Sequence, residues 1–266
     1  MAELGRRLGR GRTAEVFEYG EAWVVKLFFA EIPERAVERE TSVAAALVAA
    51  GIPAPVYLGP IDLDGRRGLL FERVAGPSML EVVGRQPWRA VGLAAQLAEV
   101  HAAVNRGSAD LEPQREYLRR HVGRADVPEP VRERALAAIE RLPDGDRVCH
   151  GDFHPDNVVL TARGAVVLDW PNATRGVPAG DVARTMMLFR DAALPEHIPP
   201  AKAVLFQAIR RLSGSVYLTR YRRLTGLCPE DLAAWRLPLI VARLAENVPP
   251  VERRRFLAEA EAALLE

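Results

Sequence analysis

The stretch Cys149-His150-Gly151-Asp152-Phe153-His154-Pro155-Asp156-Asn157-Val158-Val159-Leu160 decides how this chain folds. It starts with turn-forming residues and ends in an apolar, β-branched run, which predicts a loop leading into a strand. A second apolar run, Ala165-Val166-Val167-Leu168, ends at Asp169. The residues between the runs, Thr161-Ala162-Arg163-Gly164, have the length and the glycine of a hairpin turn. We therefore expect the two runs to pair as antiparallel strands.

Oxygen-bearing side chains stand at both outer ends of this predicted hairpin. Because a hairpin brings its outer ends together, we expect Asn157 and Asp169 to share a metal ion, and oxygen ligands are those that Mg²⁺ prefers. Asp152 supplies a carboxylate that can orient and deprotonate an attacking hydroxyl. A carboxylate base combined with ligands for phosphate-bound Mg²⁺ is what phosphoryl transfer needs. The pattern therefore favours a phosphoryl-transfer site.

Two other interpretations of the same stretch compete with this one. In a metal hydrolase, three alternating side chains on one strand face could bind zinc: His150, Asp152 and His154. Gly151 and Pro155 disfavour the straight strand that this requires. Alternatively, Asp, Asn, Pro and Gly occur here only because they build turns. Turn chemistry does not explain the carboxylate at the end of the second strand.

Composition sets the outer bounds. The chain has 266 residues, 49% of them hydrophobic, enough for one large or two small domains. A formal net charge of +1 argues against a nucleic-acid or anionic-membrane partner. Two cysteines, Cys149 and Cys228, exclude a disulfide framework and favour a reducing compartment. No run resembles a signal peptide or could span a bilayer, so we expect a soluble cytoplasmic protein.

The N-terminal segment carries a glycine pattern before a predicted strand. Gly9 and Gly11 belong to a match to G-x-G-x-x-A-x-V, and such a loop can let backbone amides approach phosphates. A glycine-bearing turn before a strand is common, so the pattern alone is weak. Strands are expected at Val16–Tyr19 and Ala22–Phe29.

A buried ion pair is expected next. Pro33 opens a predicted helix that runs to about Ala50. Glu40 lies on its apolar stripe, where a carboxylate is costly unless it meets a cation. Lys26, in the preceding strand, is the natural partner, although most lysines on strands simply face solvent. A lysine held in this way can contact the α- and β-phosphates of a nucleotide.

The remaining pattern predicts an α+β fold with two lobes, a β-rich lobe at residues 1–74 and a mainly helical lobe at 75–266. His101 is interpreted as a structural histidine, Pro171 to Gly180 as an irregular loop, and Asp181 as the cap of a helix that starts at Val182. The other expected segments are strands at 56–58 and 68–74 and helices at 88–104, 114–124, 131–142, 201–224, 230–246 and 251–265.

Together these segments resemble the aminoglycoside phosphotransferase family of small-molecule kinases, whose fold is similar to that of protein kinases. The segments that carry the resemblance best are His150 to Leu160, Leu168-Asp169-Trp170 and Gly176 to Ala183. The glycine loop, the Lys26–Glu40 pair and Phe71 to Val74 extend it into the first lobe. The resemblance covers nearly the whole chain and implies a bilobal kinase-like fold.

The resemblance also implies roles for individual residues. Asp152 would be the catalytic base, and His150 would brace its loop. Asn157 and Asp169 would bind Mg²⁺, and Asp181 would hold the catalytic loop. ATP would be bound by Gly9, Gly11, Lys26 with Glu40 orienting it, and the backbones of Glu72 and Val74, with Phe71 behind the adenine.

Two departures from the family pattern stand out: Val177, where the family often has Asp, and Trp170, where protein kinases have Phe. No metal-binding position is missing, which disfavours an inactive relative. An Ala-Pro-Glu segment of the protein-kinase type is absent from the sequence, which favours a small-molecule acceptor over a protein.

The acceptor is less determined. Aminoglycosides are polycations, yet the C-terminal helices are rich in arginine and offer few carboxylates: Asp191, Glu230, Asp231 and Glu246. The expected acceptor is a small hydroxylated molecule, either an aminoglycoside or other antibiotic, which implies a resistance role, or a sugar or amino alcohol. A non-catalytic nucleotide-binding regulator is the alternative outside enzymes. The sequence does not decide between ATP and GTP or give the oligomeric state.

Overall fold

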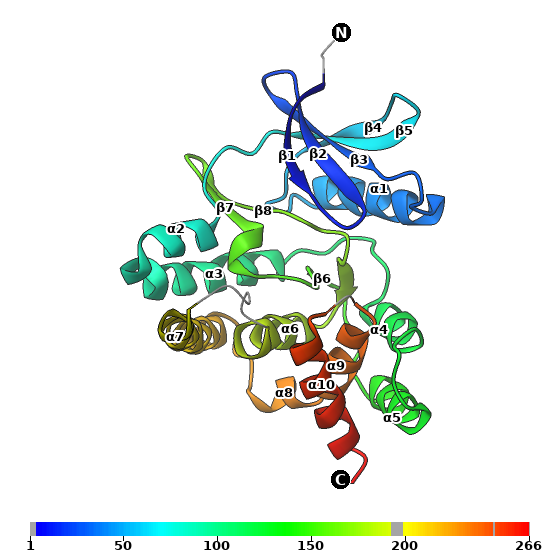
Figure 1. Cartoon of the computed structure of the whole chain (residues 1–266), viewed down its shortest axis with the longest axis vertical. Coiled ribbons are helices and arrows are strands. Elements are labelled where there is room, and N and C mark those ends of the chain that lie inside the picture. Colours follow the sequence, from blue (N-terminus) through cyan, green and yellow to red (C-terminus); the bar gives the residue numbers. More distant parts are fainter. Residues whose placement is uncertain (1–3, 193–198, 247, 266) are drawn as a thin grey trace. The chain divides into compact units, whose positions relative to one another are not determined.

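The computed structural model describes residues 4–192, 199–246 and 248–265 (Figure 1). The chain divides into two compact units. The first contains residues 1–81 and 156–172, and the second contains residues 82–155 and 173–266. One unit is built on an antiparallel sheet and the other is mainly helical, which confirms the predicted α+β class. The functional division at residue 74 stays a prediction.

The first unit is built on a five-stranded antiparallel sheet in the order β1-β2-β3-β5-β4. Its strands are β1 (Leu4–Arg10), β2 (Ala14–Tyr19), β3 (Trp23–Phe28), β4 (Tyr57–Leu63) and β5 (Arg66–Glu72). Strand β1 is not among the predicted strands, because its run of glycine and arginine has neither the alternation nor the β-branched residues of a typical strand. All of β1 is exposed, so pairing with β2 rather than burial defines it.

Helix α1 (Glu34–Ala49) covers one face of this sheet (Figure 1). Its buried Val37 packs with Ala14, Phe28 and Leu69 of the strands to form the core of the first unit. The helix ends before Gly51, whose φ of 64° is the left-handed conformation that glycine adopts at helix ends. The predicted helix is therefore confirmed within one residue at each end.

The hairpin β7 (Val158–Thr161) and β8 (Gly164–Val167) also belongs to the first unit and confirms the predicted pairing. The Val167 N–H donates to the carbonyl of Pro53 at 2.7 Å. The hairpin also passes close to the segment around Gly76, where an added Cβ would lie 2.1 Å from the Leu160 carbonyl oxygen. Only glycine fits at that position, where φ is 153°.

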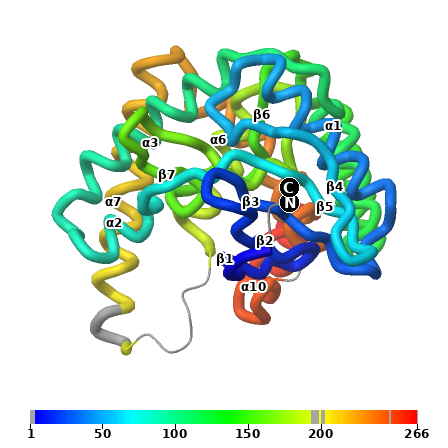
Figure 2. The backbone as a smooth tube through the Cα atoms, turned by 90° about the horizontal axis from the view of Figure 1, so that it is seen from above, coloured from blue at the N-terminus to red at the C-terminus, as the bar shows by residue number. Residues whose placement is uncertain are grey.

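The second unit is mainly helical. Helices α3 and α7 lie side by side in both views (Figures 1 and 2). Its helices are α3 (Ala90–Val104), α4 (Gln114–Val122), α5 (Glu129–Glu140), α6 (Pro178–Asp191), α7 (Pro200–Thr225), α8 (Glu230–Ala233), α9 (Arg236–Leu244) and α10 (Pro250–Ala262). Two short strands, β6 (Arg147–Cys149) and β9 (Thr174–Gly176), pair antiparallel beside α6. Helix α2 (Met79–Arg85) contains the sequence boundary between the two units.

Three expectations for this region were wrong. The segment 171–180 is not wholly irregular, because it contains β9 and the first turn of α6. Asp181 does not cap a helix that starts at Val182. Helix α6 begins at Pro178, and Asp181 lies in its first turn. The single helix expected from 230 to 246 is two helices, α8 and α9, with Trp235 buried between them.

The burial of Trp235 explains why the helix expected from 230 to 246 is divided into two. Trp235 is 1% exposed and packs in a core that includes Ile139, Ile240 and Phe256. An added Cβ at Gly180 would lie 2.6 Å from the Trp235 ring, so helix α6 can approach the indole only with glycine there. Among the described helices, none is long and apolar enough to cross a membrane.

Candidate active site

The loop that follows β6 is held from α6 by Asp181. Its carboxylate accepts the backbone N–H of His150 at 2.7 Å and that of Gly151 at 2.8 Å. Gly151 has φ of 79°, so the loop turns sharply at this point. The role expected for Asp181, that of holding this loop, matches the observed contacts, although the expected cap of Val182 does not exist.

Asp181 is 1% exposed, so its charge has to be stabilised by partners. His101 Nε2 lies 2.8 Å from Oδ2, and Asn105 Nδ2 donates to the same oxygen at 3.1 Å. Burial by itself would raise the pKa of Asp181. The contacts with His101 and the hydrogen bond from the Gly151 N–H outweigh burial and lower the pKa to about 2.

His101 is buried, and each of its ring nitrogens has a polar partner. Nδ1 lies 2.6 Å from the Tyr217 hydroxyl, and the ring stacks on Phe153 with centroids 3.9 Å apart. Burial is the main cause that raises the pKa of Tyr217, with the charges of Tyr221 and Asp181 adding to it. The interpretation of His101 as a structural histidine is confirmed by these contacts.

Asp152 presents a half-buried carboxylate from the same loop, with its side chain 23% exposed. Its backbone N–H donates to His150 Nδ1 at 3.2 Å, so the two residues are linked within the loop. Oδ1 lies 3.3 Å from Arg184 Nη2, and Oδ2 lies 3.7 Å from His154 Nε2. Burial would raise the pKa of Asp152, but His154 and Arg184 lower it well below its usual range. The carboxylate is therefore ionised at neutral pH.

Sequence reasoning missed Arg184 and Thr185. Arg184 is 6% exposed and also contacts Glu246 at 2.9 Å, and Thr185 Oγ1 donates to the Phe153 carbonyl at 2.9 Å. Their spacing from Asp181 in the sequence could have identified them. Positions i, i+3 and i+4 from Asp181 share one helix face, so residues 184 and 185 point the same way as the residue that holds the loop.

In the first unit, Lys26 Nζ contacts Glu40 Oε1, and both side chains are less than a fifth exposed. Lys26 lies on β3, where it stands opposite Val16 in the register with β2, and Glu40 lies on α1. The predicted pair is confirmed as a contact. Glu34, at the start of the same helix, is 68% exposed.

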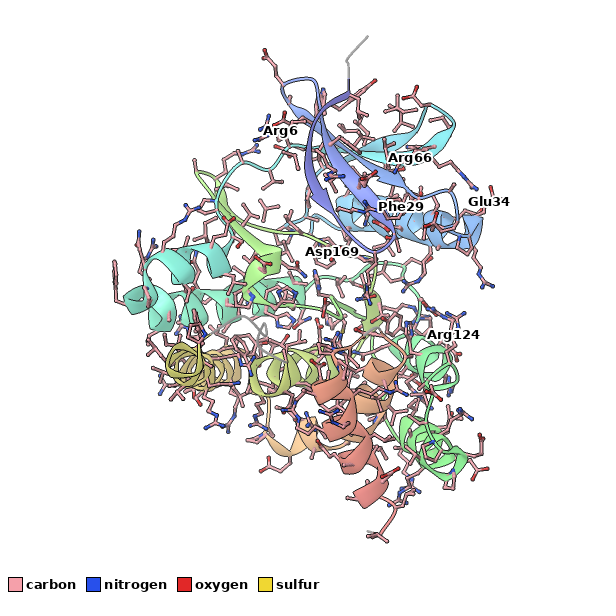
Figure 3. The ribbon with its side chains drawn as sticks, viewed as in Figure 1. Arg6, Phe29, Glu34, Arg66, Arg124 and Asp169 are labelled. Carbon is pink, nitrogen blue, oxygen red and sulfur yellow. The ribbon has the colours of Figure 1, made fainter. Side chains whose placement is uncertain are left out.

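The hairpin brings the outer ends of its strands together, as expected. The Leu168 N–H donates to the Asn157 carbonyl at 2.8 Å, directly before Asp169. Asp169 is exposed and has φ of 62°, a left-handed conformation that aspartate tolerates better than most residues (Figure 3). Trp170 is buried and donates to the Val167 carbonyl at 2.7 Å, which anchors the chain after the turn.

Gly9 ends up near the end of β1, and Gly11 in the tight turn to β2. The Gly11 N–H donates to the Ala14 carbonyl at 2.9 Å. An added Cβ at Gly9 would meet nothing within 4 Å, and Gly9 does not adopt a positive φ. The fold itself therefore does not require glycine at position 9.

The end of β5 carries the residues expected near adenine. The Glu72 N–H already donates to the Val56 carbonyl at 2.9 Å, and its carboxylate contacts Arg163. Val74 lies two residues beyond the strand, and the partly buried Phe71 packs on the core of the first unit.

The sequence-predicted residues divide between the two units. The first contains Gly9, Gly11, Lys26, Glu40, Glu72, Val74, Asn157 and Asp169, and the second contains His150, Asp152 and Asp181. Across the described part of the chain, no three His, Cys, Asp or Glu side chains form a cluster that could hold a metal ion.

The fold is that of the small-molecule kinases. It resembles aminoglycoside-3'-phosphotransferase of type VIII with a TM-score of 0.56 and 22% identity, covering 89% of this chain and 92% of that one. It resembles an amicoumacin kinase, solved with AMP-PNP, Ca²⁺ and Ami, with a TM-score of 0.62 and 15% identity, covering 97% and 88%. A streptomycin and ADP complex of an aminoglycoside phosphotransferase from Streptomyces rimosus has a TM-score of 0.55 and 18% identity, covering 88% and 91%.

The model of the phosphotransferase enzyme family (APH) matches residues 5–214, so the chain belongs to that family. The chain is 30% identical over 173 residues to acyl-CoA dehydrogenase family member 11 of Gallus gallus, which covers 55% of this chain and 22% of that protein. It is 26% identical over 261 residues to acyl-CoA dehydrogenase family member 10 of Mus musculus, covering 86% and 24%. The chain spans less than a quarter of the length of these relatives.

Proposed function

We propose that the protein is an ATP- and Mg²⁺-dependent O-phosphotransferase that transfers the γ-phosphoryl group of ATP to a hydroxyl of a small molecule. The observation that carries this proposal is the half-buried carboxylate of Asp152 on a loop whose backbone is fixed by Asp181, in a chain of the phosphotransferase family. A base that is already ionised and held in position is what transfer to a hydroxyl requires.

Residues of the first unit support nucleotide binding. Lys26, held by Glu40, supplies a cation for the α- and β-phosphates. Gly9 has open space where a side chain would stand, although the fold does not demand glycine there, which suits a close approach of phosphate. Structures of similar fold were solved with ADP, GDP or AMP-PNP.

Asn157 and Asp169 fit a magnesium ion. Both offer oxygen atoms, and the carboxylate of Asp169 is exposed at the end of the hairpin. Bound Mg²⁺ would neutralise charge on the nucleotide phosphates. The left-handed backbone at Asp169, fixed by the buried Trp170, would direct the carboxylate out of the line of β8.

In the transfer itself, Asp152 would accept the proton of the acceptor hydroxyl. The hydroxyl oxygen would form the new bond to the γ-phosphorus as the bond from that phosphorus to the β,γ-bridging oxygen breaks. The electron pair of the broken bond would leave with ADP, which Lys26 would help to stabilise.

The proposed acceptor is a small hydroxylated molecule, an aminoglycoside or other antibiotic in the first instance, with a sugar or amino alcohol as the alternative. Two of the four carboxylates available for a polycation are already engaged, Glu246 by Arg184 and Arg243, and Asp191 by Arg236. This engagement weakens the case for a polycationic acceptor relative to a neutral one.

An ADP-release screen with MgATP tests the function. The acceptors would be kanamycin, streptomycin, amicoumacin, simple sugars and amino alcohols, with a mixed peptide library as the comparison. We expect ADP release above the water background with at least one small hydroxyl compound and none with peptides. Binding of ATP in a thermal-shift assay without ADP release with any compound would instead establish a non-catalytic nucleotide binder.

A further inference from the structure

Helix α6 holds the loop 150–153 at three points from one face. Asp181 and Thr185 bind backbone atoms of the loop, whereas Arg184 reaches a side chain, that of Asp152, with Nη2 3.3 Å from Oδ1. The backbone contacts fix where the loop runs. The contact from Arg184 is the one among the three that acts on the torsion angles of the proposed base.

Arg184 is itself firmly anchored. Its Nη2 also lies 2.9 Å and 3.2 Å from the two carboxylate oxygens of Glu246. Glu246 contacts Arg243, which in turn lies 2.9 Å from the buried Glu252 on α10. A chain of alternating charges thus runs from Asp152 to the last helix.

The buried Arg184 is shared between two carboxylates, those of Asp152 and Glu246. A buried cation that paired with one carboxylate alone would strongly compensate the negative charge of that carboxylate, because electrostatic interactions are stronger away from water. Here the shorter contact is to Glu246 and the longer one is to Asp152. Asp152 is therefore held in place without becoming half of a tight, exclusive ion pair.

We propose, resting on the phosphotransferase function above, that Arg184 is a positioning residue that fixes the rotamer of Asp152, and that Glu246 keeps Arg184 from binding Asp152 too tightly. A purely structural arginine would contribute to stability and leave turnover unchanged.

Steady-state ADP release from MgATP tests the role of Arg184, with the best acceptor of the screen or with water if none is found. Arg184→Met should lower kcat by about 100-fold, since a misplacement of about 1 Å costs that much. The KM for ATP should stay within about threefold. Arg184→Lys should restore part of kcat, because it returns the charge without the planar geometry.

Arg236→Met is the matched control. Arg236 is another arginine of the second unit, with its side chain 34% exposed, and its ion pairs are with Asp191 and Glu259, each at 2.6 Å. It should lose thermal stability but keep kcat. Because Arg184→Met leaves a buried carboxylate with one partner fewer, the double variant Arg184→Met with Glu246→Gln serves if the single variant does not fold. Equal kcat in wild type and these variants would overturn the proposal.

A second measurement does not need turnover. Aspartate selectively labelled with ¹³C at the carboxyl carbon reports the titration of Asp152, assigned by its absence in Asp152→Asn. The charged or titratable groups near Asp152 in its unit are His150 and His154 on the loop and Arg184 with its partners Glu246 and Tyr117. Arg184→Met should raise the pH at the midpoint of the Asp152 titration, and Arg236→Met should leave it unchanged. An unchanged midpoint would refute the positioning role, whereas a shifted midpoint in an enzyme that releases no ADP would refute only the phosphotransferase function.

Discussion

The loop at Asp152 in the second unit and the hairpin end at Asp169 in the first are held in different ways. The loop is fixed by buried partners, with Asp181 1% exposed and bonded to two backbone N–H groups. The carboxylate of Asp169 is exposed and makes no ion pair with any residue in the described ranges. In the proposed function, Asp152 is positioned by the protein before any ligand arrives, whereas Asp169 would gain its partners from the ligand.

A charged carboxylate is energetically costly where it is buried and not where it is exposed. A buried carboxylate without partners would shift its pKa upward, and Asp181 avoids this through His101 and two N–H groups. The exposed carboxylate of Asp169 keeps its contact with water and needs no buried partner. Sites that must keep a fixed geometry and sites that must exchange ligands therefore use different degrees of burial.

The largest effect is expected at Asp152. Asp152→Ala should lower ADP release by about 10²- to 10⁴-fold, the range that general base catalysis contributes. ATP binding, measured by thermal shift, should survive because the nucleotide-side residues belong to the first unit. Asp144→Ala, which removes a 76% exposed carboxylate of the second unit, is the control and should keep full turnover. Wild-type turnover in Asp152→Ala would remove the proposed base.

The next effect is expected at the hairpin end. Asp169→Asn should abolish the part of the thermal stabilisation by ATP that depends on Mg²⁺, because a charged ligand is lost while the left-handed backbone is retained. Asp64→Asn is the control, since Asp64 is also exposed and has φ of 52° in the turn between β4 and β5. An Asp169→Asn variant that still gains Mg²⁺-dependent stability from ATP would contradict the metal assignment.

A smaller effect is expected on stability and its pH dependence through Asp181. Its folded pKa of about 2 lies below the usual 3.8, so ionised Asp181 stabilises the fold above about pH 4, and this contribution is lost as the pH falls toward 2. The contribution is about 2 kcal/mol. Asp181→Asn should lose about that much at neutral pH and show a flatter profile in acid. Urea unfolding from neutral to acidic pH measures both, and identical profiles for the two proteins would contradict the assignment.

The smallest effect is expected at the surface of the first unit. Arg67 pairs with Glu34 at 2.7 Å, but the side chains are 45% and 68% exposed. Such pairs are screened by solvent, so Arg67→Ala should change the free energy of unfolding by less than about 0.5 kcal/mol. Glu40→Gln removes the partner of the less exposed Lys26 and should raise the KM for ATP, which Arg67→Ala should not. If Arg67→Ala raised the KM for ATP more than Glu40→Gln did, the difference drawn between the two ion pairs would be wrong.

Much of the fold could be predicted because it depends on short-range patterns. The hairpin followed from two apolar runs and a glycine turn, and α1 followed from Pro33, an apolar stripe and Gly51. The Lys26–Glu40 contact followed from the cost of a carboxylate on an apolar stripe. Strand β1 could not be predicted, because exposed arginines and glycines carry no strand signal and pairing with β2 alone defines it.

The sequence by itself determined the α+β class, the hairpin that brings Asn157 and Asp169 to one end, and the family to which the chain belongs. Only the tertiary structure decided that Asp181 lies inside α6 and does not cap it, and that Arg184 joins Asp152 to Glu246, 62 positions further along the chain. The physical reason is that periodicity and turn chemistry act between neighbours. The partner of a buried charge is chosen by how distant helices pack, which no local pattern encodes.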